Sequence, residues 1–156
     1  MDELIITQAA KEDLPTILDV QKKAFMDVAK IFHLKSMPQI EQALESLTTE
    51  FENCIFLKAC ILNKIIGSVR AYKKGNVCHI SKLIVLPEYQ NKGTGKALMN
   101  EAENIFRDIV NCYELFTGCR DKRNINLYSK LGYESFKVEK YSDEISYVFM
   151  RKSSGK

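Results

Sequence analysis

The chain has 156 residues, a formal net charge of +3 and 28% charged side chains. This length can bury one hydrophobic core but is too short for two ordinary domains, and no segment is long and apolar enough to span a membrane. The small positive charge is spread along the chain, without a basic run interleaved with aromatic residues, which argues against a nucleic-acid-binding protein.

The first half of the chain alternates between strand-like and helix-like patterns. A β-branched stretch predicts a strand over Leu4 to Gln8, and an apolar stripe predicts a helix over Lys11 to Lys30. After a break at Ser36 to Pro38, a second stripe predicts a helix from Pro38 to Phe51. Three further strands are predicted over Cys54 to Leu62, Lys64 to Tyr72 and Val77 to Leu86. Short polar turns separate them, so we expect antiparallel neighbours.

The second half continues as a mixed sheet with helices. Leu98, Ala102 and Ile105 recur at helical spacing after Gly95 and predict a helix there. The later elements are a strand over Cys112 to Thr117, a helix over Arg123 to Leu131, and strands over Tyr133 to Val138 and Ile145 to Arg151. The pattern predicts one α/β (α+β) domain over residues 1–151, with a mostly antiparallel sheet of about seven strands and about four helices. Residues 152–156 are expected to form a loose tail.

Five cysteines and two histidines bear on the compartment and on metal binding. Four of the cysteines fall in or beside predicted strands, and these are Cys54, Cys60, Cys78 and Cys112. None has a partner at Cys-x-x-Cys spacing, which is typical of reduced thiols in a cytoplasmic protein. No metal site is expected, because the histidines are not clustered. The acidic amino-terminal residues argue against a signal peptide.

One segment in the middle of the chain has the composition of an anion-binding loop. It reads Gln90, Asn91, Lys92, Gly93, Thr94, Gly95 and Lys96. The glycines open the predicted helix, whose first turn has free backbone N–H groups and the positive end of the helix dipole. These features together favour a phosphate or pyrophosphate, and the two lysines add cationic side chains.

The spacing of the loop excludes two common phosphate-binding motifs. A Walker A loop requires a glycine at the position of Gln90 and a serine or threonine at that of Ala97. A dinucleotide fingerprint requires a third glycine where Leu98 stands, and it usually follows the first strand of a chain. Neither a nucleoside triphosphatase nor a dinucleotide-dependent enzyme therefore fits.

The loop and a later segment together resemble the GNAT superfamily of N-acetyltransferases. The acetyl-CoA loop of this family has Arg or Gln, two residues, Gly, one residue, and Gly or Ala, a pattern that Gln90 to Gly95 matches. Residues Asn124 to Tyr133 are similar to the family's closing helix and following strand, written Ala-x-x-x-Tyr-x-Lys-x-Gly-Phe. This chain departs from the pattern with Asn124 in place of Ala, and with Asp121 where many members have Asn.

The resemblance implies a GNAT-like fold, with acetyl-CoA as cosubstrate and direct acetyl transfer to a primary amine. It implies that the CoA pyrophosphate lies on residues 90–96 and that the strand before the loop splays from its neighbour. Backbone groups of that strand would bind the pantetheine arm, and Asn124 is a further implied cofactor-binding residue. The strand residues concerned are Leu83, Ile84 and Val85. The N–H of Val85 is the implied oxyanion donor, and Tyr128 matches the family's tyrosine, which is proposed to protonate the CoA thiolate.

The general base is open on the sequence alone. Strand alternation predicts a common face for His79, Ser81, Leu83 and Val85. Some amine-acetylating relatives have histidines at the positions of His79 and Ser81, and imidazole suits the deprotonation of an amine, directly or through water. A lone strand histidine is nevertheless more often structural. The alternatives are Glu88, Glu52 and a chain of water molecules.

The acceptor amine and the assembly state are also open. We expect the first two helices and the segments around Phe32 and Tyr141 to recognise the amine, with Phe25 lining an apolar slot or forming ordinary core. Polyamines, amino acids, antibiotics and peptide amino termini all fit. An acyl-CoA-binding sensor without transfer activity is the alternative function. The resemblance also implies a homodimer as one assembly state.

Overall fold

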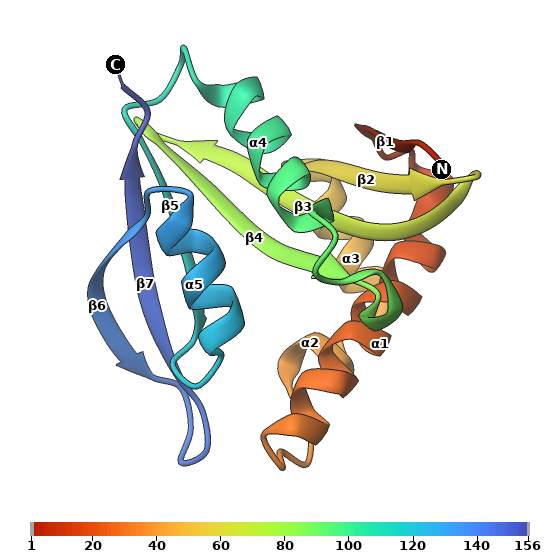
Figure 1. The fold of residues 1–156 in the computed structure, drawn as a ribbon, viewed down its shortest axis with the longest axis horizontal. Helices are drawn as coiled ribbons and strands as arrows, with labels where there is room; N and C mark the ends of the chain where they lie inside the picture. The colour runs from red at the N-terminus through yellow and green to blue at the C-terminus, as the bar shows by residue number, and fades with distance from the viewer. Residues whose placement is uncertain (1, 156) are drawn as a thin grey trace.

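A seven-stranded sheet organises residues 2–155, the part of the chain that the computed structural model describes (Figure 1). The strands are β1 (Leu4–Gln8), β2 (Ile55–Ile61), β3 (Lys64–Lys74), β4 (Val77–Val85), β5 (Cys112–Gly118), β6 (Glu134–Lys140) and β7 (Ser146–Ser153). They lie in the order β1-β2-β3-β4-β5-β7-β6, and all neighbours are antiparallel except β4 and β5. The prediction of a mixed, mostly antiparallel sheet is confirmed.

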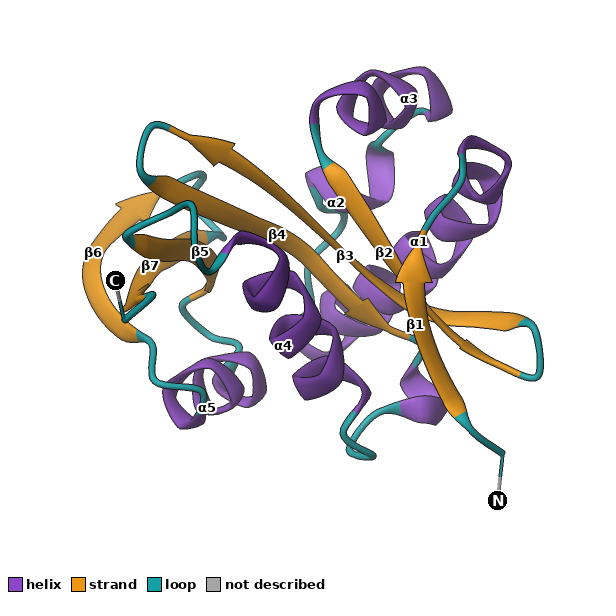
Figure 2. Ribbon diagram, turned by 90° about the horizontal axis from the view of Figure 1, so that it is seen from above, coloured by secondary structure: helices purple, strands orange, loops and turns teal. Residues whose placement is uncertain are grey.

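Helices cover both faces of this sheet. Within residues 2–155 the α-helices are α1 (Leu14–Ile31), α2 (Pro38–Glu41), α3 (Leu44–Asn53), α4 (Thr94–Phe106) and α5 (Lys122–Lys130). Two 3-10 turns, η1 (Lys11–Asp13) and η2 (Pro87–Tyr89), precede α1 and the loop before α4. Figure 2 shows α1, α2 and α3 on one face and α4 and α5 on the other. No helix in this described part is both long and apolar enough to cross a membrane.

Two tight hairpins connect β2, β3 and β4, as the polar turns predicted. Leu62 and Asn63 both have positive φ, 50° and 65°, between β2 and β3. Two consecutive left-handed residues form the turn whose twist matches that of paired strands. Gly75, with a φ of 61°, serves the same purpose between β3 and β4.

The helix predicted from Pro38 to Phe51 is two helices, α2 and α3. Gln42 has a ψ of 132° and Ala43 is extended, so the helical backbone stops between them. The Gln42 side chain accepts a hydrogen bond from Gln21 of α1 and donates one of 2.6 Å to Glu50 of α3. These tertiary bonds hold Gln42 in a non-helical turn, which accounts for one helix more than predicted.

The carboxy-terminal residues predicted as a loose tail are largely ordered, although Lys156 lies outside the described residues. Strand β7 continues to Ser153, and Ser154 donates from its backbone N–H to Asn111 (2.9 Å). Lys152 forms an ion pair of 2.7 Å with Glu103, whose side chain is 4% exposed. Sequence composition does not reveal such a buried carboxylate partner, so the prediction was wrong from 152 to 154.

The feature of the sheet that matters for a site is the divergence of β4 from β5. The two parallel strands pair only where Val77 to His79 face Cys112 to Glu114. Beyond this pairing, β4 continues beside β3 and β5 continues beside β7, so a gap opens between them (Figure 1). The splayed strand that the family resemblance implied is therefore present.

Candidate functional site

Two adjoining cavities lie in the gap between β4 and β5. The loop cavity is bounded by residues 83–85 of β4, the loop before α4, and α5. The strand cavity is bounded by residues 80–83 of β4, residues 116–121 after and within β5, the α1–α2 segment, and the β6–β7 turn. Both cavities share Phe25, Val28, Leu83, Asp121 and Asn124. They therefore form one continuous site with two ends.

The loop before α4 presents its backbone to the loop cavity. Gly93 precedes the helix with a left-handed φ of 87°, and the first helical hydrogen bond runs from the N–H of Ala97 to the Gly93 carbonyl (3.0 Å). The N–H groups between them have no helical acceptor and carry the positive end of the helix dipole. An anion in this cavity would meet several backbone donors.

The predicted loop residues mostly line this cavity. Those that do are Gln90, Asn91, Gly93, Thr94, Gly95 and Lys96. Lys92 is the exception, because its ammonium group lies over the ring of Tyr89, 5.8 Å from the centroid, and the residue does not line the cavity. Sequence reasoning missed Arg123, which lines the cavity and donates to Gln90 Oε1 (3.2 Å). The sequence feature that could have indicated Arg123 is its place directly before Asn124, a predicted cofactor-binding residue.

Backbone groups at the end of β4 face the gap. The N–H of Leu86 donates to the carbonyl of Ile66 in β3 (2.8 Å). Because backbone polar groups alternate along a strand, the N–H and C=O of Val85 point away from β3 and into the gap. The Val85 carbonyl accepts a hydrogen bond from Gln90 Nε2 (3.0 Å). The same alternation turns the groups of Ile84 toward β3, so Ile84 lines the cavity with fewer free backbone groups than predicted.

A bulge at Lys82 and Leu83 shifts the register of β4 against β3. These two residues lie opposite Val69 alone, and Lys82 has a left-handed φ of 53°. One extra residue reverses the alternation of side chains, so His79 and Val85 point to opposite faces of the sheet. The common face predicted for His79, Ser81, Leu83 and Val85 is therefore wrong.

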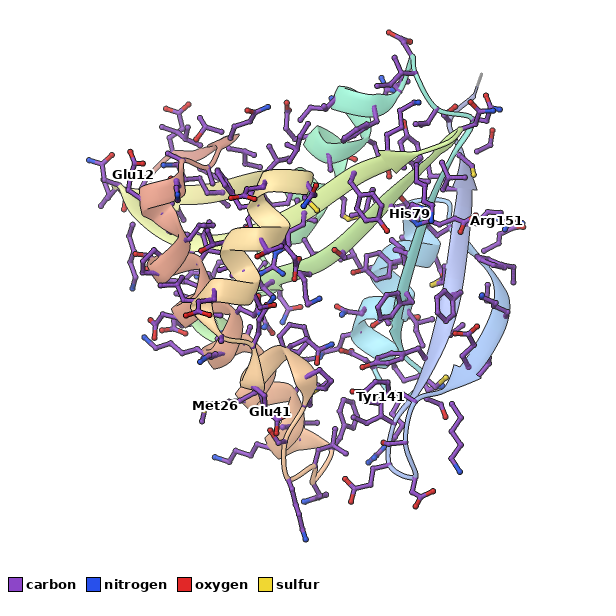
Figure 3. All side chains as sticks on the ribbon, turned by 180° about the vertical axis from the view of Figure 1, so that it is seen from behind. Glu12, Met26, Glu41, His79, Tyr141 and Arg151 are labelled. Atoms are coloured by element: carbon purple, nitrogen blue, oxygen red, sulfur yellow. The ribbon has the colours of Figure 1, made fainter. Side chains whose placement is uncertain are left out.

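The structure does not bring the predicted histidine base to the cavities. The imidazole of His79 stacks on the ring of Tyr72, with centroids 5.0 Å apart, and His79 lines neither the loop cavity nor the strand cavity. Figure 3 shows His79 well away from Tyr141, which marks the β6–β7 turn. Tyr141 is 59% exposed and lines neither cavity, whereas Phe25 and Phe32 do line the strand cavity. The alternative bases Glu52 and Glu88 also lie outside both cavities.

Helix α5 carries Tyr128 and Asn124 into the site. Asp121 caps the helix by accepting from the N–H of Asn124 (3.2 Å), and the Asn124 side chain donates to Thr117 Oγ1 (3.4 Å). Tyr128, one turn later, is 5% exposed and lines the strand cavity, with its ring edge-on to Tyr133. Burial, and to a lesser extent the charge of Asp121, raise the pKa of Tyr128, so its hydroxyl stays protonated.

No cluster of His, Cys, Asp or Glu side chains in residues 2–155 is arranged to hold a metal ion. The five cysteines are free thiols. Burial raises the pKa of the Cys78 thiol to about 12, so this thiol is neutral in the fold.

Comparison with known proteins adds the family. The sequence model of the acetyltransferase (GNAT) family matches residues 15–133. An uncharacterized N-acetyltransferase of Methanocaldococcus jannaschii is 29% identical over 147 residues, which are 86% of this chain. The catalytic subunit of the N-terminal acetyltransferase B complex of Arabidopsis thaliana is 31% identical over 97 residues, which are 60% of this chain. The matched regions span only 62% and 56% of these two relatives.

Among solved structures, the PaiA N-acetyltransferase from Thermoplasma acidophilum in complex with coenzyme A has the same fold. It superposes with a TM-score of 0.81 at 24% identity and covers 97% of this chain and 99% of that chain. This likeness establishes the architecture in which the two cavities lie.

Proposed function

The chain belongs to the acetyltransferase (GNAT) family, and we propose that it transfers the acetyl group of acetyl-CoA directly to a primary amine. In this proposal the loop cavity takes the pyrophosphate and pantetheine arm, and the strand cavity takes the acceptor amine. The solved relative with coenzyme A bound, and the N-acetyltransferase names of the sequence relatives, support the choice of cosubstrate and reaction.

The observation that carries the proposal is the convergence of free backbone groups on one gap. Val85 directs its N–H into the gap, and the loop before α4 directs its unpaired N–H groups to the adjoining cavity. Lys96 and Arg123 add positive charge. Asp121, the carboxylate that lines the same cavity, is the N-cap of α5 and accepts a hydrogen bond from the N–H of Asn124. This donor set suits a long anionic ligand that is held mainly through backbone.

The acetyl thioester of the cosubstrate supplies an activated acyl group, and the chain supplies position, charge stabilisation and a proton. The N–H of Val85 is proposed to donate to the oxyanion that forms when the amine attacks the carbonyl. Tyr128, protonated and directed into the strand cavity, is proposed to protonate the departing thiolate. Asn124 lines both cavities and is proposed to contact the pantetheine arm between them.

We assign the deprotonation of the acceptor to solvent in the strand cavity. His79 is stacked on Tyr72 outside the cavity, and Glu52 and Glu88 also lie outside it. A chain of water molecules can relay the proton of an ammonium group to bulk solvent without a dedicated side chain. This assignment predicts that replacing His79 by Gln leaves turnover within about twofold of the wild-type value.

Two measurements test the proposal. Acetyl-CoA and CoA at about millimolar concentration should raise the melting temperature, because a ligand that binds only the folded state stabilises it. Thiol release from acetyl-CoA should then depend on the addition of an amine from a panel of polyamines, amino acids and peptides. The absence of any CoA-dependent stabilisation would overturn the proposal.

The alternative is an acyl-CoA sensor that keeps the fold without transfer activity. It shares the loop cavity and predicts the same thermal stabilisation. It differs in predicting no amine-dependent release of thiol from any member of the panel. The position of the Tyr128 ring at the strand cavity, where the departing thiol would lie, favours the transferase.

A further inference from the structure

Lys82 stands at the bulge of β4, beside the strand cavity. Its left-handed φ of 53° is unusual for a lysine, and the bulge places two consecutive residues of β4 opposite Val69. Lys82 and its neighbours Ser81 and Leu83 line the strand cavity. A bulge at this place re-aims a side chain that strict alternation would direct elsewhere.

Two opposite charges, those of Arg70 and Glu50, act on Lys82. Arg70, whose side chain is 1% exposed, pairs with Glu50 Oε2 (2.9 Å) and also donates to Gln21. The other oxygen of Glu50 accepts from Gln42 (2.6 Å), so both oxygens of this carboxylate are engaged. Lys82 forms no ion pair with any residue between 2 and 155. Burial, and then the nearby charge of Arg70, lower the pKa of Lys82.

The other charged residues that line the strand cavity either bind other groups of the protein or are exposed at the rim of the cavity. Arg120 donates to the carbonyl of Phe32 (3.1 Å) and lies over its ring. Asp121 caps α5, and Glu144 is exposed on the β6–β7 turn. Lys82 is thus the half-buried charge of this cavity that has no ion pair of its own in the described chain, because the nearby Glu50 carboxylate is engaged with Arg70 and Gln42. A desolvated charge without a partner is unfavourable unless a ligand supplies one.

A second polar group of the same cavity also lacks a partner. Gln39 of α2 is 8% exposed, and its Oε1 is the one buried side-chain nitrogen or oxygen of residues 2–155 without a hydrogen bond. The backbone carbonyl of Gln39 accepts from Gln21 (2.8 Å), which fixes α2 beside the network of Arg70. Gln39 lines the strand cavity together with Lys82. Two residues that line this cavity therefore have a polar group without a hydrogen-bond partner among residues 2–155, one cationic and one accepting.

We propose that Lys82 determines acceptor specificity by binding a carboxylate of the acceptor, so that the substrate is an amine that also carries a carboxylate. This inference rests on the transferase function proposed above. A carboxylate would give Lys82 an ion pair of its own through a charge-assisted hydrogen bond, while an N–H of the same acceptor would satisfy Gln39 Oε1. A polyamine would instead bring a second cation toward Lys82 and Arg70, which is electrostatically unfavourable. Phe25, Phe32 and Phe116 offer apolar surface to the carbon skeleton.

The carboxylate can come from a free amino acid or from an acidic side chain of a peptide, and matched substrates distinguish the two. Thiol release is measured with amino acids and their amides, with dipeptides that have Asp or Asn at the second position, and with putrescine. One kind of matched pair, either amino acid and amide or Asp and Asn dipeptide, should support thiol release. Within that pair, the wild type should have a kcat/KM for the carboxylate substrate at least ~10-fold above that for the amide. This ratio should fall to about one in Lys82→Met and recover in Lys82→Arg. Lys73→Met, at an exposed lysine of β3, should leave the ratio unchanged.

An equilibrium experiment tests Lys82 independently of turnover. The CoA-bound protein is titrated with N-acetyl amino acids and with their amides, and binding is measured by calorimetry. Tighter binding of the carboxylates to the wild type, lost in Lys82→Met, supports the inference. Equal binding in the two proteins, or a preference of the wild type for putrescine or the amides, overturns it. Absence of thiol release with every amine would instead contradict the transferase function, and this binding comparison would still decide the role of Lys82.

Discussion

The side chain of Gln90 donates a hydrogen bond of 3.0 Å to the carbonyl oxygen of Val85, which ties the loop before α4 to the end of β4. The Oε1 atom of the same side chain accepts from Arg123 of α5. Gln90 thus joins the three elements that surround the loop cavity. Because both polar atoms of its side chain are bonded to protein, we propose that Gln90 positions the backbone donors of the loop rather than binding the phosphate itself.

Replacing Gln90 by Ala should weaken CoA binding about fivefold, because one net hydrogen bond is worth about 1 kcal/mol and its loss loosens the loop. Calorimetric titration with CoA measures the change. Gln8→Ala, at an exposed glutamine of β1 outside both cavities, is the matched control and should bind CoA as the wild type does. If the two variants bind CoA equally well, Gln90 does not organise the loop.

Gly93 and Gly75 form a matched pair for testing the loop backbone. Both have positive φ, 87° and 61°, and neither has an atom within 4 Å of an added Cβ. Alanine at either position should lower the free energy of unfolding by about 1–2 kcal/mol through backbone strain alone. Only Gly93→Ala should also weaken CoA binding, because Gly75 lies in the distant β3–β4 hairpin. A parallel loss of CoA affinity in both variants would show that the effect is one of general stability.

Tyr128→Phe should reduce kcat about 100-fold or more while CoA affinity changes less than about twofold, because the hydroxyl acts only when the thiolate departs. Tyr72→Phe, which removes a hydroxyl outside both cavities, is the control. Since burial raises the pKa of Tyr128, its deprotonation should not reduce turnover in the mildly alkaline range. An unchanged kcat in Tyr128→Phe would remove this residue from the acid role.

The elements that local patterns determine were predictable from the sequence, and those that depend on distant partners were not. Turn residues and alternation predicted the strands β2, β3 and β4 to within about two residues. The break at Gln42 depends on side chains of α1 and α3, and the ordering of Lys152 depends on Glu103. Neither partner can be recognised from a local pattern.

The same distinction holds for the site. Loop residues 90–96 and Tyr128 follow motifs whose spacing is local, and the structure places Tyr128 and all of these loop residues except Lys92 around the two cavities. The bulge at Lys82 contains no glycine that would indicate it in the sequence, so simple alternation predicts the same face for His79 and Val85, which is wrong. Local patterns do not indicate that Lys82 lines a cavity. A lysine in a strand ordinarily indicates a solvent-facing position.

The ion pair between Asp13 and Lys58 should give the protein a stability that depends on pH. Asp13 Oδ2 accepts from Lys58 Nζ (2.8 Å) and from the N–H of Ala10 (2.8 Å). The hydrogen bond from Lys58 is the main cause that lowers the pKa of Asp13, and the same bond raises the pKa of Lys58. The stability due to Asp13 is therefore present above its unfolded pKa of about 4 and is lost as the pH falls through its lower folded pKa. That due to Lys58 is present below its unfolded pKa and is lost as the pH rises through its higher folded pKa.

Asp13→Asn should accordingly lower the free energy of unfolding by about 1 kcal/mol at about pH 7, since the pair is partly buried, with side chains 17% and 24% exposed. The difference from the wild type should shrink as the pH falls below about 4, where the wild-type carboxylate also becomes neutral. Urea denaturation at several pH values measures both effects. Asp19→Asn removes the exposed pair with Lys23 and should change the free energy by less than about 0.5 kcal/mol at any pH. A loss in Asp13→Asn that persists unchanged in acid would assign the effect to packing or helix capping, because a charge interaction must disappear when the charge does.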